Sequence, residues 1–150
     1  MKKKVTYKDI IKFNACYDPI EIGMPKTYSD TIPNFIKEYR DKVKNTEDII
    51  WFLCRKEYMT DKDMRLFAVW CAREALKLVE SPDERSINAC NVAEKFANGE
   101  ATQEDLDAAR AAARDAARDA AWAAARAAAG DAAWDAAWDA QLNHLLTYFK

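Results

Sequence analysis

The chain has 150 residues, half of them hydrophobic and about a third charged, with a formal net charge of −2. This length suits a single domain, and the near-neutral charge argues against general binding to nucleic acid or to anionic membranes. The apolar runs fall short of the roughly 18 residues needed to span a bilayer, and the basic start lacks the apolar core of a signal peptide. We therefore expect a cytoplasmic protein without membrane contacts.

Two sets of residues that often form binding sites have plainer interpretations here. Three consecutive lysines begin at Lys2, and a terminal run of this kind is typical of a solvated, frayed end rather than a binding arm. The four cysteines are far apart and form no CxxC pair, and three of them lie in apolar helical stretches. We expect reduced core thiols rather than zinc ligands or disulfides at Cys16, Cys54, Cys71 and Cys90.

Helix starts are marked by Ser or Thr followed three residues later by an acidic residue, the pattern of a capping box. Gly99 is expected to end one helix, because glycine adopts the left-handed conformation at little cost. No run alternates between apolar and polar residues as a strand does. The capping boxes are Thr6/Asp9, Thr60/Asp63, Ser81/Glu84 and Thr102/Asp105. They predict helices over 6–14, 31–43, 46–58, 61–79 and 82–97, an irregular segment over 16–30 and an alanine-rich helical end over 102–149.

These elements predict an all-α single domain, a bundle of six or seven helices that ends in an alanine-rich helical hairpin. Its N-terminal helices would span 1–60 and its core helix pair 61–99. Met64–Val79 is apolar on nearly every side, which is typical of a helix in the middle of a bundle. The expected core residues are Met64, Leu66, Phe67, Trp70, Cys71, Ala75 and Leu78, and in the next helix Ile87, Cys90, Ala93, Phe96 and Ala97.

From Asp107 to Ala140 the chain repeats in quartets, and 20 of these 34 residues are alanine. Alanine has the highest helix propensity, so a helix is expected. A repeat of four drifts by about 40° per quartet, so no single face of a continuous helix over 103–149 would carry the large residues. Such a helix would also be about 70 Å long, against roughly 40 Å for a compact domain of this size. We therefore favour a break near Gly130, with Asp131 capping a second helix, over a continuous helix that projects or dimerises.

The two halves of this region differ in charge. Arginines recur at helical spacing before Gly130, whereas Asp131, Asp135 and Asp139 follow it without a nearby base. In a hairpin the two rows could approach each other, for example Arg126 near Asp135, and they could equally form a solvated face stabilised by local pairs. The tryptophans are anchors either for the core or for a partner. Because Arg and Trp dominate interface hot spots, the candidate binding residues are Arg110, Arg114, Arg118, Trp122, Arg126, Trp134 and Trp138.

Little in the sequence suggests catalysis. The single histidine, His144, is expected on a helix face, and the sequence contains no phosphate loop, nucleophile elbow or HExxH motif. A pair of carboxylates could still meet in three dimensions for acid–base work. Three aspartates on one helix are weak cation ligands when no histidine or cysteine joins them. We expect a non-enzymatic protein with neither a cofactor nor a metal ion.

Part of the chain resembles a known family. The segments are RLFAVWCAR (Arg65–Arg73), DERS (Asp83–Ser86) and VAEKFANGEAT (Val92–Thr102), followed by the alanine and tryptophan quartets. Over about 65–142 they are similar to the immunity protein family of bacterial polymorphic toxin systems, whose relatives also occur in bacteriophage genomes. The resemblance implies a small, cytoplasmic, non-enzymatic protein that protects by binding a toxin or effector. Four residues match the family pattern, and we expect them to cap helices or form buried pairs rather than to contact a ligand: Arg65, Arg73, Arg85 and Ser86.

Three functional hypotheses remain. The first is an immunity or anti-defence protein that docks a protein partner through its alanine, tryptophan and arginine helices. The second is a ligand-sequestering protein in which the arginines hold the phosphates of a nucleotide and tryptophans stack on its base. The third is a structural or homo-oligomerisation module.

Overall fold

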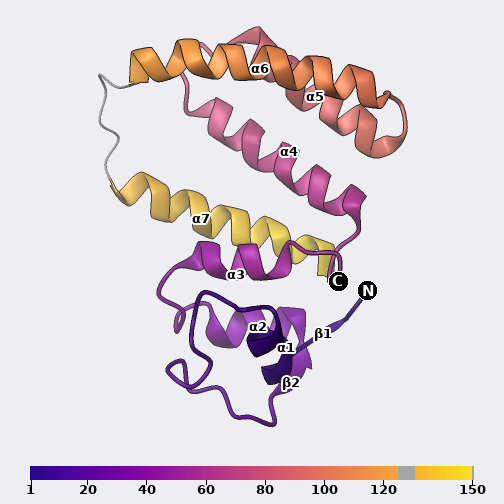
Figure 1. The fold of residues 1–150 in the computed structure, drawn as a ribbon. Coiled ribbons are helices and arrows are strands. Elements are labelled where there is room, and N and C mark those ends of the chain that lie inside the picture. The colour runs from indigo at the N-terminus through magenta and orange to yellow at the C-terminus, as the bar shows by residue number, and fades with distance from the viewer. Residues whose placement is uncertain (125–130, 150) are drawn as a thin grey trace. The chain divides into compact units, whose positions relative to one another are not determined.

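The computed structural model of the protein describes the backbone of residues 1–124 and 131–149, and the side chains of residues 1–117 and 138–149 (Figure 1). Within these residues it contains seven α-helices, one short 3₁₀ helix and a two-stranded sheet. The predicted all-α class is therefore confirmed. The elements are β1 (Lys4–Thr6), α1 (Tyr7–Lys12), β2 (Ser29–Thr31), α2 (Ile32–Tyr39), α3 (Thr46–Leu53), α4 (Asp61–Lys77), α5 (Glu84–Asn98), α6 (Gln103–Ala124), α7 (Asp131–Leu145) and the 3₁₀ helix η1 (Leu146–Phe149).

The chain divides into two compact units. The first unit comprises Met1–Thr60 and Ala132–Lys150, and the second unit comprises Asp61–Asp131. The alanine-rich region is shared between them, because α6 belongs to the second unit and nearly all of α7 to the first. The predicted break near Gly130 lies outside the described residues, between α6 and α7. The single domain and the helical hairpin therefore stay predictions.

A short antiparallel sheet begins the first unit. Val5 of β1 is opposite Asp30 of β2. The expectation that the chain has no strand was wrong, because strands of three residues are too short to show an alternating pattern. The sheet places the start of the chain beside the start of α2, where the backbone N–H of Ile32 donates to the carbonyl of Lys3 at 3.3 Å.

Aromatic rings form much of the core of the first unit. The ring of Phe35 in α2 lies 6.0 Å from that of Phe52 in α3, measured between centroids. The ring of Phe52 lies 5.5 Å from that of Tyr58. Large rings bury much apolar area per residue, which favours stability in a small unit. Other side chains buried in this unit are Val5, Ile10, Ile32, Ile36, Tyr39, Ile49 and Leu53.

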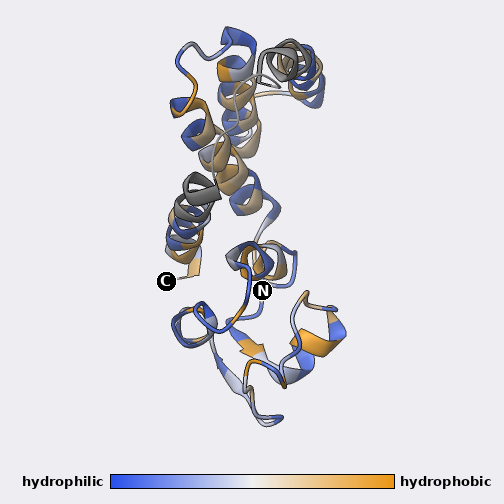
Figure 2. Cartoon of the chain, turned by 90° about the vertical axis from the view of Figure 1, so that its left-hand side faces the viewer, coloured by the Kyte–Doolittle hydropathy of each residue, from blue (hydrophilic) through white to orange (hydrophobic). Residues whose placement is uncertain are grey.

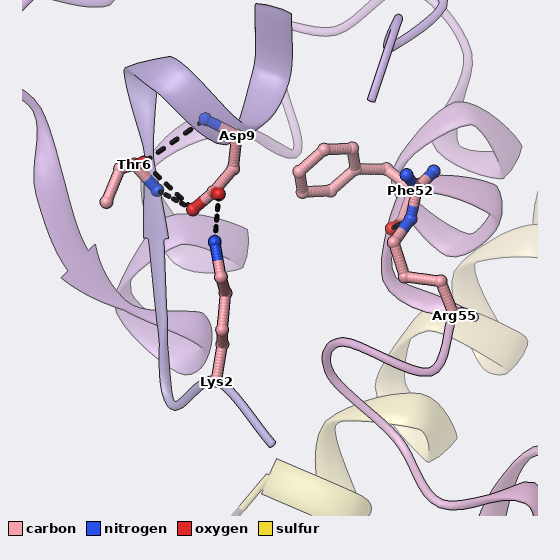
Figure 3. A network of polar contacts seen from close by, with 5 residues as sticks. All are labelled: Lys2, Thr6, Asp9, Phe52 and Arg55. Atoms are coloured by element: carbon pink, nitrogen blue, oxygen red, sulfur yellow. Dashed lines mark hydrogen bonds and ion pairs between the residues drawn. The ribbon is translucent and has the colours of Figure 1, made fainter. Parts of the chain in front are cut away.

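Arg55 covers one side of this aromatic core. Its guanidinium carbon lies 4.5 Å from the ring centroid of Phe13 and 5.0 Å from those of Trp51 and Phe52. Its Nε donates to the backbone carbonyl of Phe52 at 2.6 Å, and Figure 3 shows the two residues side by side. The guanidinium is thus held by cation–π contacts and a hydrogen bond at the edge of an apolar cluster.

A buried carboxylate fixes the start of α1. The backbone N–H of Asp9 donates to Thr6 Oγ1 at 3.1 Å, and the Asp9 carboxylate accepts from the backbone N–H of Thr6 at 3.1 Å, which confirms this capping box (Figure 3). Lys2 Nζ forms an ion pair with the same carboxylate. The expectation of a fully solvated lysine run was therefore wrong for Lys2, because β1 brings the chain end beside α1. Burial alone would raise the pKa of Asp9, but hydrogen bonds from Lys2 and Thr6 outweigh it and hold the pKa below its usual range.

The C-terminal helix completes the first unit. Leu142 and Leu145 are fully buried, and Arg40 at the end of α2 donates to Asp139 at 3.0 Å and to Asn143 at 3.1 Å. Asp139 of the acidic row, which has no base near it in the sequence, thus has a basic partner. Its partner comes from a residue about a hundred positions earlier, which no local pattern could reveal.

Three helices form the second unit, and α5 packs against both α4 and α6. Hydrophilic and hydrophobic residues alternate along the helical ribbons (Figure 2), as expected for amphipathic helices. The side chain of Thr102 and the backbone N–H of Asp105 form the predicted capping box of α6 at 3.1 Å, and Gly99 ends α5 with a φ of 79°. The prediction for the start of α5 was wrong: Asp83, not Ser81, is its N-cap.

The expectation that 61–79 lies in the middle of the bundle was also wrong. Within α4 only Phe67 and Val69 are buried, and the side chain of Leu78 just beyond its end is 77% exposed. Instead α5 has a neighbouring helix on two sides. The apolar residues of α4 point in several directions, and only one of its faces packs against α5, so a hydrophobic composition alone did not identify the central helix.

Replacing Asp9 with asparagine should lower the free energy of unfolding by about 2 kcal/mol at neutral pH, because it removes a charged cap and an ion pair. Since the pKa of Asp9 is depressed in the folded state, its contribution is fully present above about pH 4 and is lost as the pH falls through the folded value. Chemical denaturation of both proteins between neutral and acidic pH measures the difference. The control is Asp41→Asn, at a carboxylate that is 91% exposed. An equal loss in both variants would contradict the role given to Asp9.

Replacing Leu142 with alanine should destabilise the protein by about 2–5 kcal/mol, the range for a leucine truncated in a packed core. Arg40→Ala should cost under about 1 kcal/mol, because its partner Asp139 is largely exposed. Urea denaturation followed by circular dichroism distinguishes the two effects. A wild-type midpoint for Leu142→Ala would show that α7 does not contribute to the core of the first unit.

Candidate functional site

Two cavities lie along the second unit and share Cys90, and we call them together the α4–α5 groove. The first has a volume of about 200 Å³ and the second about 320 Å³. The first is lined by Arg65, Ala68, Val69, Ala72, Ala89, Cys90, Ala93 and Arg110, and the second by Arg73, Leu76, Lys77, Pro82, Ile87 and Cys90.

Helical spacing shows which sides of α4 line the two cavities. At about 100° per residue, the α4 residues of the first cavity point about 80° away from those of the second, so the cavities lie against different sides of the helix. Opposite them, α5 presents Ala89 and Ala93, whose methyl groups leave space between the helices. An alanine at these positions can neither fill the groove nor cover its floor.

The end of the groove near the α4–α5 connection exposes large aliphatic side chains. Leu78 is 77% exposed, Val79 50% and Ile87 40%. Ile87 lines the second cavity together with Leu76 and Pro82. Several large exposed apolar residues in one region of a protein mark interaction sites more often than a single exposed residue does. The expectation that Leu78 and Ile87 belong to the core was wrong, because the turn after α4 directs no helix onto them.

Charged side chains brace the groove. The guanidinium carbon of Arg65 lies 4.6 Å from the ring centroid of Phe96, and Arg73 donates to Glu94 at 2.6 Å and to Asn91 at 3.0 Å. The hydrogen bond from Arg73 lowers the pKa of Glu94. Both arginines therefore tie α4 to α5. Burial raises the pKa of the Cys90 thiol at the floor, although the charge of Arg73 opposes this shift.

The arginines of the family-like segments thus have structural roles, in part as expected. Arg85 pairs with the N-cap Asp83 at 2.7 Å, and Arg73 pairs with Glu94. These pairs are about 40% exposed rather than buried, so the expectation of buried pairing was only half correct. Arg65 stacks on an aromatic ring and also lines the groove.

The predicted binding residues are distributed over both units. Arg110 lines the first cavity and lies 4.0 Å from Asp107, an i,i+3 pair expected from the sequence. Arg114 is exposed on the same helix. Trp138 is half-buried on α7 and belongs to the first unit. The side chains of four further candidates lie outside the described residues: Arg118, Trp122, Arg126 and Trp134. The pairing of Arg126 with Asp135 also falls there.

The exposed residues Leu78, Val79 and Ile87 were not among those predicted to bind a partner. A signal was present, because Leu78 and Val79 continue the apolar composition of α4 directly up to the turn residues ESP at 80–82. Large aliphatic residues in a turn after a helix stay exposed unless another element of the fold packs against them. Arg65 was assigned a structural role only, since its proximity to Arg110 depends on how three helices pack.

The first unit has a separate cavity of about 510 Å³, formed by α1 and the segment that follows it. Its rim includes Ile11 and Ile20, which are 54% and 65% exposed, and Cys16 is exposed within it. The expectation of a core thiol was therefore wrong for Cys16. Burial of its sulfur and the nearby Asp48 raise the pKa of this thiol, which disfavours the reactive thiolate.

The described residues form neither a metal site nor a membrane span. Among the side chains that the structure describes, those of 1–117 and 138–149, no three metal-ligating groups are gathered together, and no helix of the described backbone combines the length and apolarity of a membrane span. His144 lies on α7, 5.7 Å from the ring of Tyr148 between centroids. The α4–α5 groove is therefore the candidate functional site.

Comparison of the chain with protein-family models, with curated proteins and with solved structures found no match.

Proposed function

We propose that this chain is a non-enzymatic binding protein that neutralises a toxin or defence effector by direct protein–protein contact, as its resemblance to immunity proteins implies. The observation that supports the proposal best is the largely apolar lining of the α4–α5 groove, which includes Ile87, together with the exposed side chains of Leu78 and Val79 just beyond the end of α4.

The composition of this surface favours a protein partner. Its floor is apolar and its borders carry arginines, a combination typical of interfaces in which apolar anchors are surrounded by polar contacts. Leaving a leucine exposed forgoes about 1.5–3 kcal/mol of burial, which a partner could recover on binding. The second unit is braced internally by Arg73 and Glu94, so the groove exists before a partner arrives.

The test begins with affinity capture in the native bacterial host and continues with the purified candidate toxin. The wild-type protein should bind it and restore growth of cells that produce it. Leu78→Asp should weaken binding about tenfold or more, a loss of at least about 1.4 kcal/mol, because it places a charge on the exposed apolar surface. Binding is measured by calorimetry and protection by colony counts.

The matched control is Ile20→Asp, which places the same charge on an aliphatic side chain of comparable exposure in the first unit. It should retain both binding and protection. Equal protection by wild type and Leu78→Asp, or failure of the wild type to protect against any toxin that it binds, would contradict the proposal.

A second candidate function is supported by two guanidinium-bearing side chains on the same small cavity. Arg65 and Arg110 both line the first cavity, and two arginines near one site can hold a phosphate-bearing ligand. The rest of the lining of this cavity is apolar, which disfavours inorganic phosphate. The base or sugar of a nucleotide would have to contact this apolar part.

A thermal-shift screen against nucleotides and cyclic nucleotides tests this second function. A ligand at 100 times its Kd stabilises the protein by about 2.7 kcal/mol, which is a clear rise in Tm. Arg110→Ala should remove the rise, whereas Arg114→Ala, at an exposed arginine outside the cavity lining, should not. The absence of any shift with the wild type would eliminate the nucleotide function.

A further inference from the structure

We infer that the first unit binds a small phosphate monoester with an aromatic group, at a place where positively charged side chains surround one phenylalanine ring. We call this place the Phe13 cluster, and its members are Lys2, Lys12, Phe13, Trp51 and Arg55. All five lie within Met1–Thr60 of the first unit, whereas the α4–α5 groove belongs to the second unit. The inference therefore goes beyond the proposed function and does not depend on it.

Three cationic groups converge on the ring of Phe13. From its centroid, Lys12 Nζ is 5.4 Å away, Lys2 Nζ 5.5 Å and the guanidinium carbon of Arg55 4.5 Å. Because these distances share one end point, any two of the cations lie within about 11 Å of each other, where like charges still repel. A ring has only two faces, so at least two of the three cations lie over the same face. An anion bound between them would relieve the repulsion.

The fold brings these charges together from three separate segments. Lys2 precedes β1 and is held by its backbone N–H, which donates to the carbonyl of Glu57 at 2.6 Å. Lys12 is the last residue of α1. Arg55 follows α3, and its Nε donates to the carbonyl of Phe52 at 2.6 Å. The cluster is therefore a product of the tertiary structure and exists before a ligand arrives.

The charge balance of the cluster favours a doubly charged ligand. The charge of Lys2 is neutralised by its ion pair with Asp9 (Figure 3). Among the described residues, no carboxylate forms an ion pair with Lys12 or with Arg55. Two positive charges thus remain uncompensated. A phosphate monoester carries about −1.5 to −2 charges at neutral pH and matches them, whereas a single carboxylate would neutralise only one.

Arg55 and Lys12 supply complementary donors for such a phosphate. The guanidinium of Arg55 is stacked among aromatic rings and uses its Nε–H within the fold, so the N–H groups of its two terminal nitrogens are the ones suited to a ligand. These groups can donate as a pair to two phosphate oxygens. Lys12 is exposed, and its flexible side chain can bring a third donor onto the same phosphate.

Trp51 explains why an aromatic ligand is expected. Its side chain is 52% exposed, and its ring centroid lies 5.0 Å from the guanidinium carbon of Arg55. An aromatic group attached to the phosphate can stack on the exposed indole and remove apolar area from water. The phosphate would then contact Arg55 and Lys12 while the aromatic group contacts Trp51.

Calorimetry of the full-length protein with phenyl phosphate tests the inference. Phenyl phosphate should bind more tightly than inorganic phosphate, which lacks the ring, and at least about tenfold more tightly than benzoate, which carries a single charge. Phenol, which is uncharged, should not bind. The affinity for phenyl phosphate should fall as salt rises. In a nitrogen–proton correlation spectrum the indole N–H signal of Trp51, assigned with Trp51→Phe, should shift on binding.

Variants locate the site. Lys12→Gln, at an exposed side chain, should weaken phenyl phosphate about tenfold, and Lys12→Arg should retain binding because it keeps the charge. The matched control is Lys26→Gln, the same change at an exposed lysine of the first unit outside the cluster. Arg55→Lys should weaken binding similarly, because it removes the paired donors, and circular dichroism checks its fold. Arg110→Ala, in the α4–α5 groove, should bind as the wild type does.

Several results would overturn the inference. The wild type could fail to bind millimolar phenyl phosphate, could bind phenol equally well, or could lose no affinity in Lys12→Gln. Loss of binding in Arg110→Ala would move the ligand to the groove. Binding to vesicles that contain phosphatidic acid, without binding to phenyl phosphate, would assign the cluster to a lipid headgroup in a membrane instead. Each of these failures leaves neutralisation of a toxin through the second unit unaffected, so the two proposals are tested separately.

Discussion

Small side chains at the helix contacts are the constraint on which the second unit depends. Ala89, Cys90 and Ala93 of α5 line the first cavity beside α4, and two of the three residues of α6 given as buried are alanines, Ala109 and Ala116, the third being Leu106. Methyl-sized groups let helix axes approach to the short end of the usual range of 8–10 Å, yet each contributes little buried area. The helices are therefore held together by added polar contacts between α4 and α5, and the same small side chains leave the groove open.

The first unit is instead packed with large side chains, which bury more apolar area per residue. Phe35, Tyr39 and Phe52 fill its interior, and the Asp9 carboxylate fixes the start of α1 against the N-terminal strand. Leu142 and Leu145 complete it from the far end of the chain. One sequence thus contains two kinds of packing. Aromatic packing closes a surface, whereas alanine packing leaves an accessible one, and the candidate site lies where the packing is sparse.

The contacts between α4 and α5 explain what several residues of the family-like segments do in the fold. Arg65, Arg73, Phe96 and Glu94 lie in two of those segments, and they join α4 to α5 on either side of Cys90. A pattern of residues that maintains an open surface would serve a binding protein. The residues that would contact a partner, such as Leu78 and Ile87, lie at the ends of these segments or between them.

By itself the sequence determined much of the local structure, because caps and turns involve atoms within a few residues of one another, although it placed the cap of α5 at Ser81 instead of Asp83. Thr6 with Asp9, Thr102 with Asp105 and the glycine at Gly99 behave as expected, and the helix type of every long segment follows from composition and period. Which faces are buried was decided only by the tertiary structure. Arg40 donates a hydrogen bond to Asp139, which lies about a hundred positions later in the sequence. Leu78 is exposed, although the apolar sequence around it predicts that it is buried. Burial depends on which distant element packs against a helix, and the apolar residues of α4 do not specify which of its faces that element will cover.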